Sequence, residues 1–353
     1  MKFEANRLSM LEAAQNVSKI VPHKSTTEIL RNVLVESNAD VGEIYLTATN
    51  HEVSIQQKVS ATVSESGEML INSRFLVGMM DKLEGEFVSV SADSPEVMKI
   101  TAGRCVFNIN CQSSEKYPKP IMPYPGESVI MTGICSLAKR TVFAVGDTHD
   151  KLVLQCVKLK LKNNALQATA CDGVRMMLVK DIAEPTDEKE FLLPGRALQI
   201  LASLSEDSDV FEVSEIGNEI VFVRGDMIFT IRKLNTGSYI DTNALLKRIK
   251  PEYFALVDAA KMKEALNTVS VAELVDNTRM PVNIVLRDKE IFIHCDNDYS
   301  EADSVVSANV TKITPADGFY YDGSALLKLF QILSGKVKIE IDAGGFMFVK
   351  TPQ

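Results

Sequence analysis

The chain contains the same arrangement three times, and this repeat limits the folds open to it more than any other feature. Residues 67–90, 189–213 and 317–341 each hold a short apolar strand, a small or helix-capping residue, an amphipathic helix and an alternating strand. Asn72, Pro194 and Asp322 occupy equivalent positions in the three segments. A unit that recurs at this spacing indicates tandem domains with one common fold.

Two further motifs recur in each repeat and define its remaining elements. Strand-to-turn segments occupy 46–55, 166–178 and 291–303, and strand-to-helix segments occupy 3–21, 129–145 and 254–272. Period-two alternation, as in Val157–Lys162, predicts strands, and a proline-rich stretch at 118–125 and a break at 247–252 separate the repeats. We predict an α+β fold of three similar domains, each with two helices packed on antiparallel sheets, at residues 1–122, 127–246 and 251–353.

The composition is that of an ordinary soluble globular protein. Of the 353 residues, 46% are hydrophobic and 24% are charged, which excludes disordered and low-complexity classes. No apolar run is long enough to span a bilayer, and the first residues lack the apolar core of a signal peptide. The six cysteines never form a C-x-x-C pair, so we expect no disulfide framework, no metal site and a reducing, cytoplasmic location.

Positive charge is concentrated on the predicted helices of an acidic chain. The net charge is −9, yet all six predicted helices carry a positive net charge, with a combined charge of +7 that leaves −16 elsewhere. Solvated surface charge and lysines near helix C-termini are the simpler explanations. A shared basic surface made of helices also suits the phosphate backbone of duplex DNA, and no motif for reading bases is present.

Several segments resemble, in order and spacing, those of a known family. They are the opening Met1–Phe3, TATNHEVSI at 47–55, GRCVFNINCQSSEKYP at 103–118, RTVFAV at 140–145 and ATACDGVRMML at 168–178. Together they resemble the bacterial sliding clamp, the beta subunit of DNA polymerase III. This resemblance covers nearly the whole chain. It implies a noncatalytic, cofactor-free, head-to-tail homodimeric ring of six domains around duplex DNA, which tethers polymerases, clamp loaders and repair proteins.

The resemblance also implies sites for DNA and for the second subunit. In the family, basic residues on the inner helices and on nearby loops contact DNA. The matching positions here are Lys24, Arg74, Lys139, Arg140, Lys151, Arg196, Lys261, Lys263 and Lys328. The matching subunit contact would join an edge strand containing Phe107 and Ile109 to the region of Val271 and Ala272, although core packing would explain these four residues equally well.

Family clamps also bind short peptide motifs of their partners in an apolar cleft, and here the sequence departs from the family. The matching positions are Leu154, Cys171, Gly173, Val174, Arg175, Met176, Ile240, Ala244, Leu245, Asp322, Met347, Phe348 and Val349. The family usually has Thr and His in place of Cys171 and Val174, and Pro and Arg in place of Ile240 and Ala244. We therefore expect altered peptide specificity, as in a second or diverged clamp, and an adaptor ring that is never loaded on DNA is an alternative.

An enzymatic alternative rests on one loop. Asp147, His149 and Asp150 combine two carboxylates with an imidazole, a set that could hold a metal for hydrolysis. The remaining histidines lie at positions that add no matching ligand spacing, so loop residues without a catalytic role are the favoured interpretation.

Overall fold

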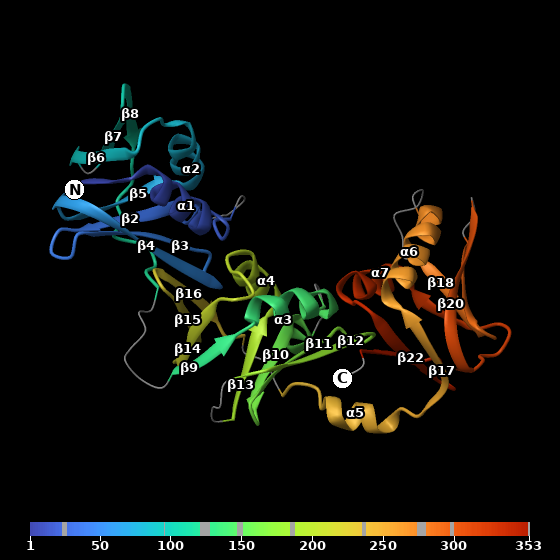
Figure 1. Ribbon diagram of the computed structural model, residues 1–353. Helices are drawn as coiled ribbons and strands as arrows, with labels where there is room; N and C mark the ends of the chain where they lie inside the picture. The colour runs from blue at the N-terminus through green and yellow to red at the C-terminus, as the bar shows by residue number, and fades with distance from the viewer. Residues whose placement is uncertain are drawn as a thin grey trace. The chain divides into compact units, whose positions relative to one another are not determined.

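The computed structural model describes residues 1–22, 27–94, 96–120, 128–146, 151–183, 188–234, 238–273, 280–296 and 300–351. By its internal contacts the chain divides into two units, Met1–Tyr239 and Ile240–Gln353 (Figure 1). Each unit is described by itself.

The first unit repeats one order of elements. Its helices are α1 (Arg7–Ser18), α2 (Ser73–Lys82), α3 (Ile134–Thr141) and α4 (Gly195–Ser203), with short 3₁₀ helices η1 (Glu28–Arg31), η2 (Val142–Ala144) and η3 (Leu152–Gln155). Its strands are β1 (Lys2–Asn6), β2 (Asn32–Asn38), β3 (Glu43–Thr49), β4 (Val53–Glu65), β5 (Gly67–Asn72), β6 (Phe87–Ser94), β7 (Val97–Ala102), β8 (Cys105–Asn110), β9 (Ser128–Thr132), β10 (Cys156–Lys162), β11 (Ala165–Cys171), β12 (Met176–Ile182), β13 (Lys189–Pro194), β14 (Val210–Ile216), β15 (Glu219–Arg224) and β16 (Met227–Arg232).

Antiparallel pairing organises these strands into two sheets. A 12-stranded sheet runs in the order β8-β7-β6-β1-β4-β16-β15-β14-β9, with β2, β3 and β5 branching from it, and β12-β11-β10-β13 form a second sheet. The pair β4–β16 joins strands of the first repeat to strands of the second. Backbone hydrogen bonding therefore connects the first two repeats within one unit.

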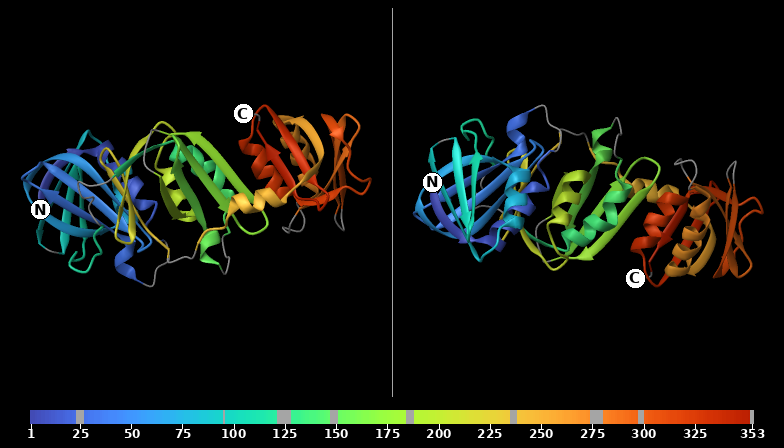
Figure 2. Two further views of the ribbon diagram at one scale, coloured as in Figure 1. Left: turned by 90° about the horizontal axis from the view of Figure 1, so that it is seen from below. Right: turned by 90° about the horizontal axis from the view of Figure 1, so that it is seen from above.

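The helices begin where the sequence supplies a capping side chain. The Asn6 Oδ1 accepts hydrogen bonds from the backbone N–H groups of Leu8 and Ser9, at 3.0 and 3.1 Å, and Asn72 caps α2 in the same way. Such a cap contributes about 1 kcal/mol to stability. The helices then lie in pairs: α1 contacts α2, and α3 contacts α4, which Figure 2 shows side by side.

The second unit contains the third repeat. It consists of α5 (Thr242–Arg248), β17 (Pro251–Asp258), α6 (Ala259–Val269), η4 (Ser270–Glu273), β18 (Pro281–Arg287), β19 (Glu290–Asp296), β20 (Glu301–Lys312), β21 (Phe319–Asp322), α7 (Gly323–Ile332), β22 (Lys336–Asp342) and β23 (Met347–Lys350). Its strands form one sheet in the order β21-β18-β19-β20-β17-β22-β23, and α6 packs against α7. Helix α5 was not predicted.

The predicted fold class is confirmed, because paired helices pack on antiparallel sheets in each repeat. Each unit has its own apolar core, and Phe211 and Phe222 meet edge to face in the first, with ring centroids 6.1 Å apart. The six cysteines are free, and five of them are buried. Among the described residues, no helix is long and apolar enough to cross a membrane.

Glu340 gives the second unit a testable pH dependence. This residue of β22 is 5% exposed and is paired with the Nζ atoms of Lys338 and Lys350, at 2.8 and 2.5 Å. Burial alone would raise the pKa of Glu340, but the two lysines outweigh it and hold the pKa below its usual range. The ionised form therefore stabilises the folded state above the unfolded-state pKa, and this contribution is lost as the pH falls through the folded-state pKa.

We expect Glu340→Gln to lower the free energy of unfolding by about 1–3 kcal/mol at pH 7, because two ammonium groups lose their anionic partner. The difference from wild type should shrink as the pH falls below about 4. Urea denaturation across this pH range measures it, with exposed Glu12→Gln as the control. A difference that does not change with pH would contradict the assignment.

Candidate nucleic-acid interface

Most of the predicted DNA-contacting residues have exposed side chains. Those in the first unit are Arg74 on α2, Arg196 on α4 and Lys151 just before η3, and those in the second are Lys261 and Lys263 on α6 and Lys328 on α7. Lys24 lies outside the described residues. The structure thus places exposed basic side chains on paired helices in both units.

Arg74 and Arg196 lie at helix positions that do not favour a cation. Arg74 and Arg196 are each the second residue of their helix, and no acidic residue occupies the first turn of α2, α4 or α6. The positive end of the helix dipole makes a cation unfavourable there. The helix dipole therefore does not stabilise either cation, and Arg74 has a further interaction within the chain.

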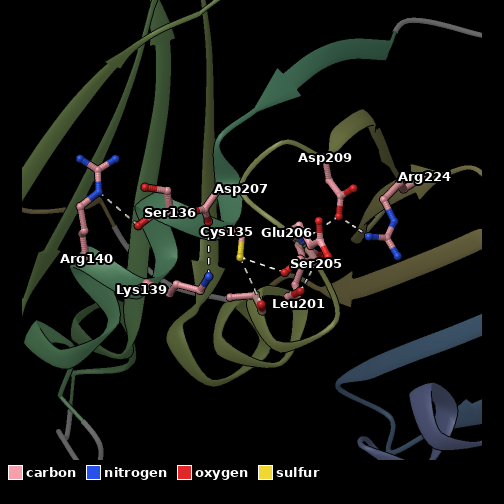
Figure 3. A network of polar contacts seen from close by, with 11 residues as sticks. Cys135, Ser136, Lys139, Arg140, Leu201, Ser205, Glu206, Asp207, Asp209 and Arg224 are labelled. Carbon is pink, nitrogen blue, oxygen red and sulfur yellow. Dashed lines mark hydrogen bonds and ion pairs between the residues drawn. The ribbon is translucent and has the colours of Figure 1, made fainter. Parts of the chain in front are cut away.

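Lys139 and Arg140 on α3 differ from this pattern, because acidic side chains neutralise both. The Nζ of Lys139 lies 3.3 Å from the Asp207 carboxylate, and the Arg140 guanidinium pairs with Asp181. The Nε of Arg140 also donates to the carbonyl oxygen of Ser136, at 3.2 Å (Figure 3). The net positive charge on α3 that the sequence predicted is therefore reduced by acids from neighbouring segments.

A buried thiol fixes the loop that carries Asp207. Cys135 is 1% exposed, and its Sγ donates to the carbonyl oxygens of Ala202 and Ser205, each at 3.2 Å. Burial raises the pKa of the Cys135 thiol, which keeps it protonated as a donor. In the same loop Asp209 accepts a backbone hydrogen bond from Glu206 and pairs with Arg224 (Figure 3). Asp207 is consequently held beside Lys139 by an ordered loop.

One lysine connects the helical surfaces of the first two repeats. The Nζ of Lys19, the residue after α1, donates to the carbonyl oxygen of Ser203 at the end of α4, at 2.7 Å. Arg7 at the start of α1 donates to the carbonyl oxygens of Gly85 and Met80, at 3.0 and 2.9 Å. These two basic residues thus bridge helix ends within the first unit.

The predicted peptide-cleft residues of the first unit surround one turn. Leu154 and Cys171 are only 4% and 6% exposed, so these two residues offer little accessible surface to a peptide. Val174 is 91% exposed, and Arg175 and Met176 are half-buried. The accessible surface at this turn is therefore made by these last three residues.

Hydrogen bonds define the shape of the turn. The Asp172 Oδ1 accepts from the backbone N–H groups of Val174 and Arg175, at 2.9 and 2.8 Å. The other Asp172 carboxylate oxygen lies 2.7 Å from the Nε of Arg175. Gly173 has a backbone φ of 93°, which residues that carry a Cβ rarely adopt.

The predicted cleft residues of the second unit occur on three elements. Ile240 and Ala244 are half-buried before and within α5, and Leu245 is 37% exposed. Asp322 is exposed and caps α7 through the backbone N–H of Ala325, at 3.1 Å. On β23, Met347 and Val349 pack partly against the core, whereas the Phe348 ring lies 5.6 Å from the Lys350 Nζ.

The predicted subunit contacts lie at sheet edges, with one correction. Strand β8 is an edge strand, and Phe107 is 37% exposed while Ile109 packs partly on the core. In η4, Val271 is 62% exposed, but Ala272 is 3% exposed and belongs to the core of its unit. Its side chain therefore cannot contribute contact area to a partner.

Sequence reasoning missed two features of these sites. It did not predict α5, which carries Ala244 and Leu245, and it did not identify β20 as the strand of the third repeat that corresponds to β4 of the first. The repeat itself held the second signal, because the segment 291–303 aligns with 46–55, which leads into β4. The Asp147, His149 and Asp150 loop of the hydrolase alternative lies outside the described residues.

The repeated domains, each with paired helices on antiparallel sheets, have the architecture of a DNA clamp. Residues 1–122 match the DNA polymerase III beta subunit, N-terminal domain, and residues 131–241 match the central domain of the same subunit. These matches cover more than half of the chain. The chain belongs to the DNA polymerase III beta subunit family of bacterial sliding clamps.

Individual relatives agree with this assignment. A beta sliding clamp from Staphylococcus aureus is 26% identical over 291 residues, which cover 77% of this chain and 74% of the relative. The fold is similar to that of a putative DNA polymerase III beta subunit from Eubacterium rectale, with a TM-score of 0.91, 17% identity and coverage of 99% and 96%. The sliding clamp of Bacillus subtilis has a TM-score of 0.89 and 20% identity, with coverage of 100% and 96%.

Gly173 and Gly78 give a paired test of the turn. Gly173→Ala should lower the free energy of unfolding by roughly 1–2 kcal/mol, because a Cβ is disfavoured at positive φ. Gly78→Ala, in the middle of α2 where an added Cβ meets nothing within 4 Å, should raise it by up to about 1 kcal/mol. Urea denaturation of both variants measures the difference, and a stabilising Gly173→Ala would refute the assigned turn conformation.

Proposed function

We propose that two copies of this chain close head to tail into a ring that slides on duplex DNA and tethers DNA polymerase III and other replication and repair proteins. The ring is noncatalytic and holds DNA by encircling it. The observation that carries the proposal is a sheet junction within the chain that can be repeated between two copies.

That junction is the pairing of β16 with the first half of β4. Phe229 lies opposite Ile55, and Ile231 lies opposite Val53. Phe229, Ile231 and Ile55 are fully buried. Backbone hydrogen bonds at both ends, Lys58 N to Asp226 O and Arg232 N to Glu52 O, are each 2.8 Å long. The junction is thus a closed ladder with an apolar side.

The two strands of this junction have counterparts that could accept a further strand. Strand β8 lies at the edge of its sheet, and residues 301–307 of β20 pair with β19, whereas β17 pairs with β20 only from residue 308 onward. Strand β8 corresponds to β16, because Ala102 pairs with Cys105 across a two-residue turn as Arg224 pairs with Met227. Strand β20 corresponds to β4, because Asp296 pairs with Glu301 as Thr49 pairs with Ser54. We infer that β8 of one copy pairs with β20 of the other in the same register, which places Phe107 opposite Ala302 and Ile109 opposite Ser300.

Exposure of apolar side chains supports this pairing. Phe107, the counterpart of fully buried Phe229, is 37% exposed. The Ser300 hydroxyl donates to the carbonyl oxygen of Ala272, at 3.4 Å, which holds the start of β20 near exposed Val271. An edge strand with exposed apolar side chains is a template for a further strand. Because the contact joins different surfaces, it forms a ring when the rotation closes.

The basic residues on the helices give the proposed DNA interaction. We assign nonspecific phosphate contacts to the exposed Arg74, Lys151, Arg196, Lys261, Lys263 and Lys328, and weaker contributions to Lys139 and Arg140. Lys24 is included on the family resemblance alone. Such contacts release counterions and carry no sequence information, which suits a protein that must move along any sequence.

Partner proteins are proposed to bind through short peptide motifs at Val174, Arg175 and Met176. The predicted cleft residues of the second unit would take part as well: Ile240, Ala244, Leu245, Asp322, Met347, Phe348 and Val349. The unbranched, half-buried Met176 suits adaptable binding, and Leu245, which is 37% exposed, adds apolar surface. Cys171 and Val174 stand where the family has Thr and His, so we propose a peptide preference that differs from that of the usual clamp motif.

Phe107→Glu tests the ring. Wild type should sediment at twice the 38.9 kDa chain mass. The variant should be a folded monomer, because a carboxylate would replace the phenyl group of Phe107 at the proposed contact between copies. Analytical ultracentrifugation over a concentration series measures the mass, and Val41→Glu, at a 57% exposed turn position, is the matched control. A monomeric wild type at all concentrations, or a Phe107→Glu variant as dimeric as wild type, would refute the proposed seam.

Asp207→Asn tests whether Lys139 is restrained by its acidic neighbour. The substitution should strengthen binding to a short linear duplex and steepen the dependence of log affinity on log salt by about one, because Lys139 becomes available to a phosphate. Fluorescence anisotropy at low ionic strength measures both quantities, with exposed Asp40→Asn as the control. An unchanged salt dependence would mean that Lys139 does not face the DNA.

A further inference from the structure

A group of ionisable side chains lies on one face of the β19–β20 hairpin, away from the helices. His294 and Asp296 are two residues apart on β19, so their side chains share a face. On β20, Asp303 lies directly opposite His294, and Glu301 lies directly opposite Asp296. The strand register therefore brings one imidazole and three carboxylates together.

One imidazole nitrogen faces two of these carboxylates. The His294 Nδ1 is 2.8 Å from an Asp303 oxygen and 3.9 Å from a Glu301 oxygen. A single N–H can donate to Asp303 but leaves Glu301 beyond hydrogen-bond distance. A divalent cation in place of that proton could bind all three donors.

The second imidazole nitrogen faces a further carboxylate. The His294 Nε2 is 3.5 Å from an Asp296 oxygen. Metal-ligating histidines commonly direct their other ring nitrogen to a carboxylate, which fixes the tautomer and orients the ring. This contact is separate from those with Asp303 and Glu301. It suits a protonated imidazole, whose pKa the hydrogen bond with Asp303 raises, and it would also orient the ring for a metal at Nδ1.

Neighbouring aromatic packing holds the imidazole in place. The Phe292 ring stacks on His294 with centroids 6.3 Å apart and 13° between the planes, and the Arg287 guanidinium lies 3.8 Å from the Phe292 centroid. The His294 side chain is 23% exposed. The ring is thus positioned before any ligand binds, while the carboxylates remain accessible to solvent.

The other two repeats show that the fold does not require these charges. At the four equivalent positions the first repeat has Thr47, Thr49, Ser54 and Gln56, and the second has Thr169, Cys171, Met176 and Leu178. In the first repeat the Gln56 amide donates to the Thr47 hydroxyl, at 3.1 Å. The third repeat alone assembles three carboxylates, whose mutual repulsion a bound cation would relieve.

We propose that His294, Glu301 and Asp303 bind a divalent transition-metal ion of the Zn²⁺ type, with Asp296 as the residue that positions the imidazole. Imidazole and carboxylate donors suit Zn²⁺, whereas Mg²⁺ and Ca²⁺ prefer an all-oxygen set. The three donor atoms lie within 4.8 Å of one another. Tetrahedral Zn²⁺ with bonds of about 2.0–2.2 Å separates its ligand atoms by about 3.3–3.6 Å. Binding would therefore move the exposed Glu301 carboxylate closer and the Asp303 carboxylate slightly away from His294, and would leave a fourth position for water. All four residues belong to one chain, so the site needs no ligand from a second copy, although strand β8 of the partner would run beside Glu301 and Asp303 in the proposed ring.

Competition with a chromogenic chelator tests the site, with Zn²⁺ as the probe and the full chain in a Cys105→Ser background that removes the exposed thiol. This protein should bind one Zn²⁺ per chain. His294→Gln and Asp303→Asn should each weaken binding at least about tenfold, and Asp296→Asn should weaken it by about tenfold through the lost orientation of the ring. The control His51→Gln, an exposed histidine of the first unit, should leave the affinity unchanged.

Two further measurements separate the site from folding and from ring assembly. Without metal, the thermal unfolding midpoint of each variant should match that of wild type, because the altered side chains lie on the solvent face. Co²⁺ bound to the unsubstituted protein should give a d–d absorption band, and His294→Gln should abolish it. Adding Phe107→Glu should leave the Zn²⁺ affinity unchanged. Zn²⁺ binding equal in the His294→Gln and unsubstituted proteins, or absent from both, would overturn the proposal.

Discussion

The pairing of β16 with β4 is the interaction on which the rest of this structure depends. It converts two repeats, each with its own sheets, into one unit through a backbone ladder and a set of fully buried apolar side chains. A ladder of this kind leaves an unpaired edge at each end of a repeat array. The counterparts of its two strands are the edge strand β8 and the first half of β20, which the proposed ring would join.

The placement of charge is the second constraint. In a chain with a net charge of −9, basic residues lie on the helices, and acidic residues pair with some of them. Arg74 and Arg196 occupy first turns, where the helix dipole disfavours a cation, and in the proposed function both contact phosphates. Asp207 and Asp181 meanwhile neutralise Lys139 and Arg140. A surface that combines cations with restraining acids would bind phosphates weakly, which is compatible with movement along DNA.

Much of the architecture could be predicted from the sequence, because each repeat is governed by local signals. Apolar periodicity located the helices, with Asn72 and Asp322 marking the starts of two of them, and alternation located the strands. Helix α5 escaped prediction because it is a short segment between repeats without a counterpart in them.

Site residues were harder to predict, because burial and pairing are set by distant segments. The sequence of η4 does not distinguish Val271 from Ala272, yet one faces solvent and the other joins the core. Likewise Lys139 and Arg140 find their acidic partners 68 and 41 residues away. The cluster around His294 depends on cross-strand register, which the spacing of residues within one strand does not reveal.

Retention on circular DNA tests the central claim most directly. The protein would be loaded onto a nicked circular plasmid by a clamp loader, separated from free protein, and then followed after a restriction enzyme linearises half of the sample. A ring that encircles DNA predicts stable retention on the circle at moderate salt and rapid loss from the linear ends. Equal retention on both forms, or no retention on either, would contradict the account.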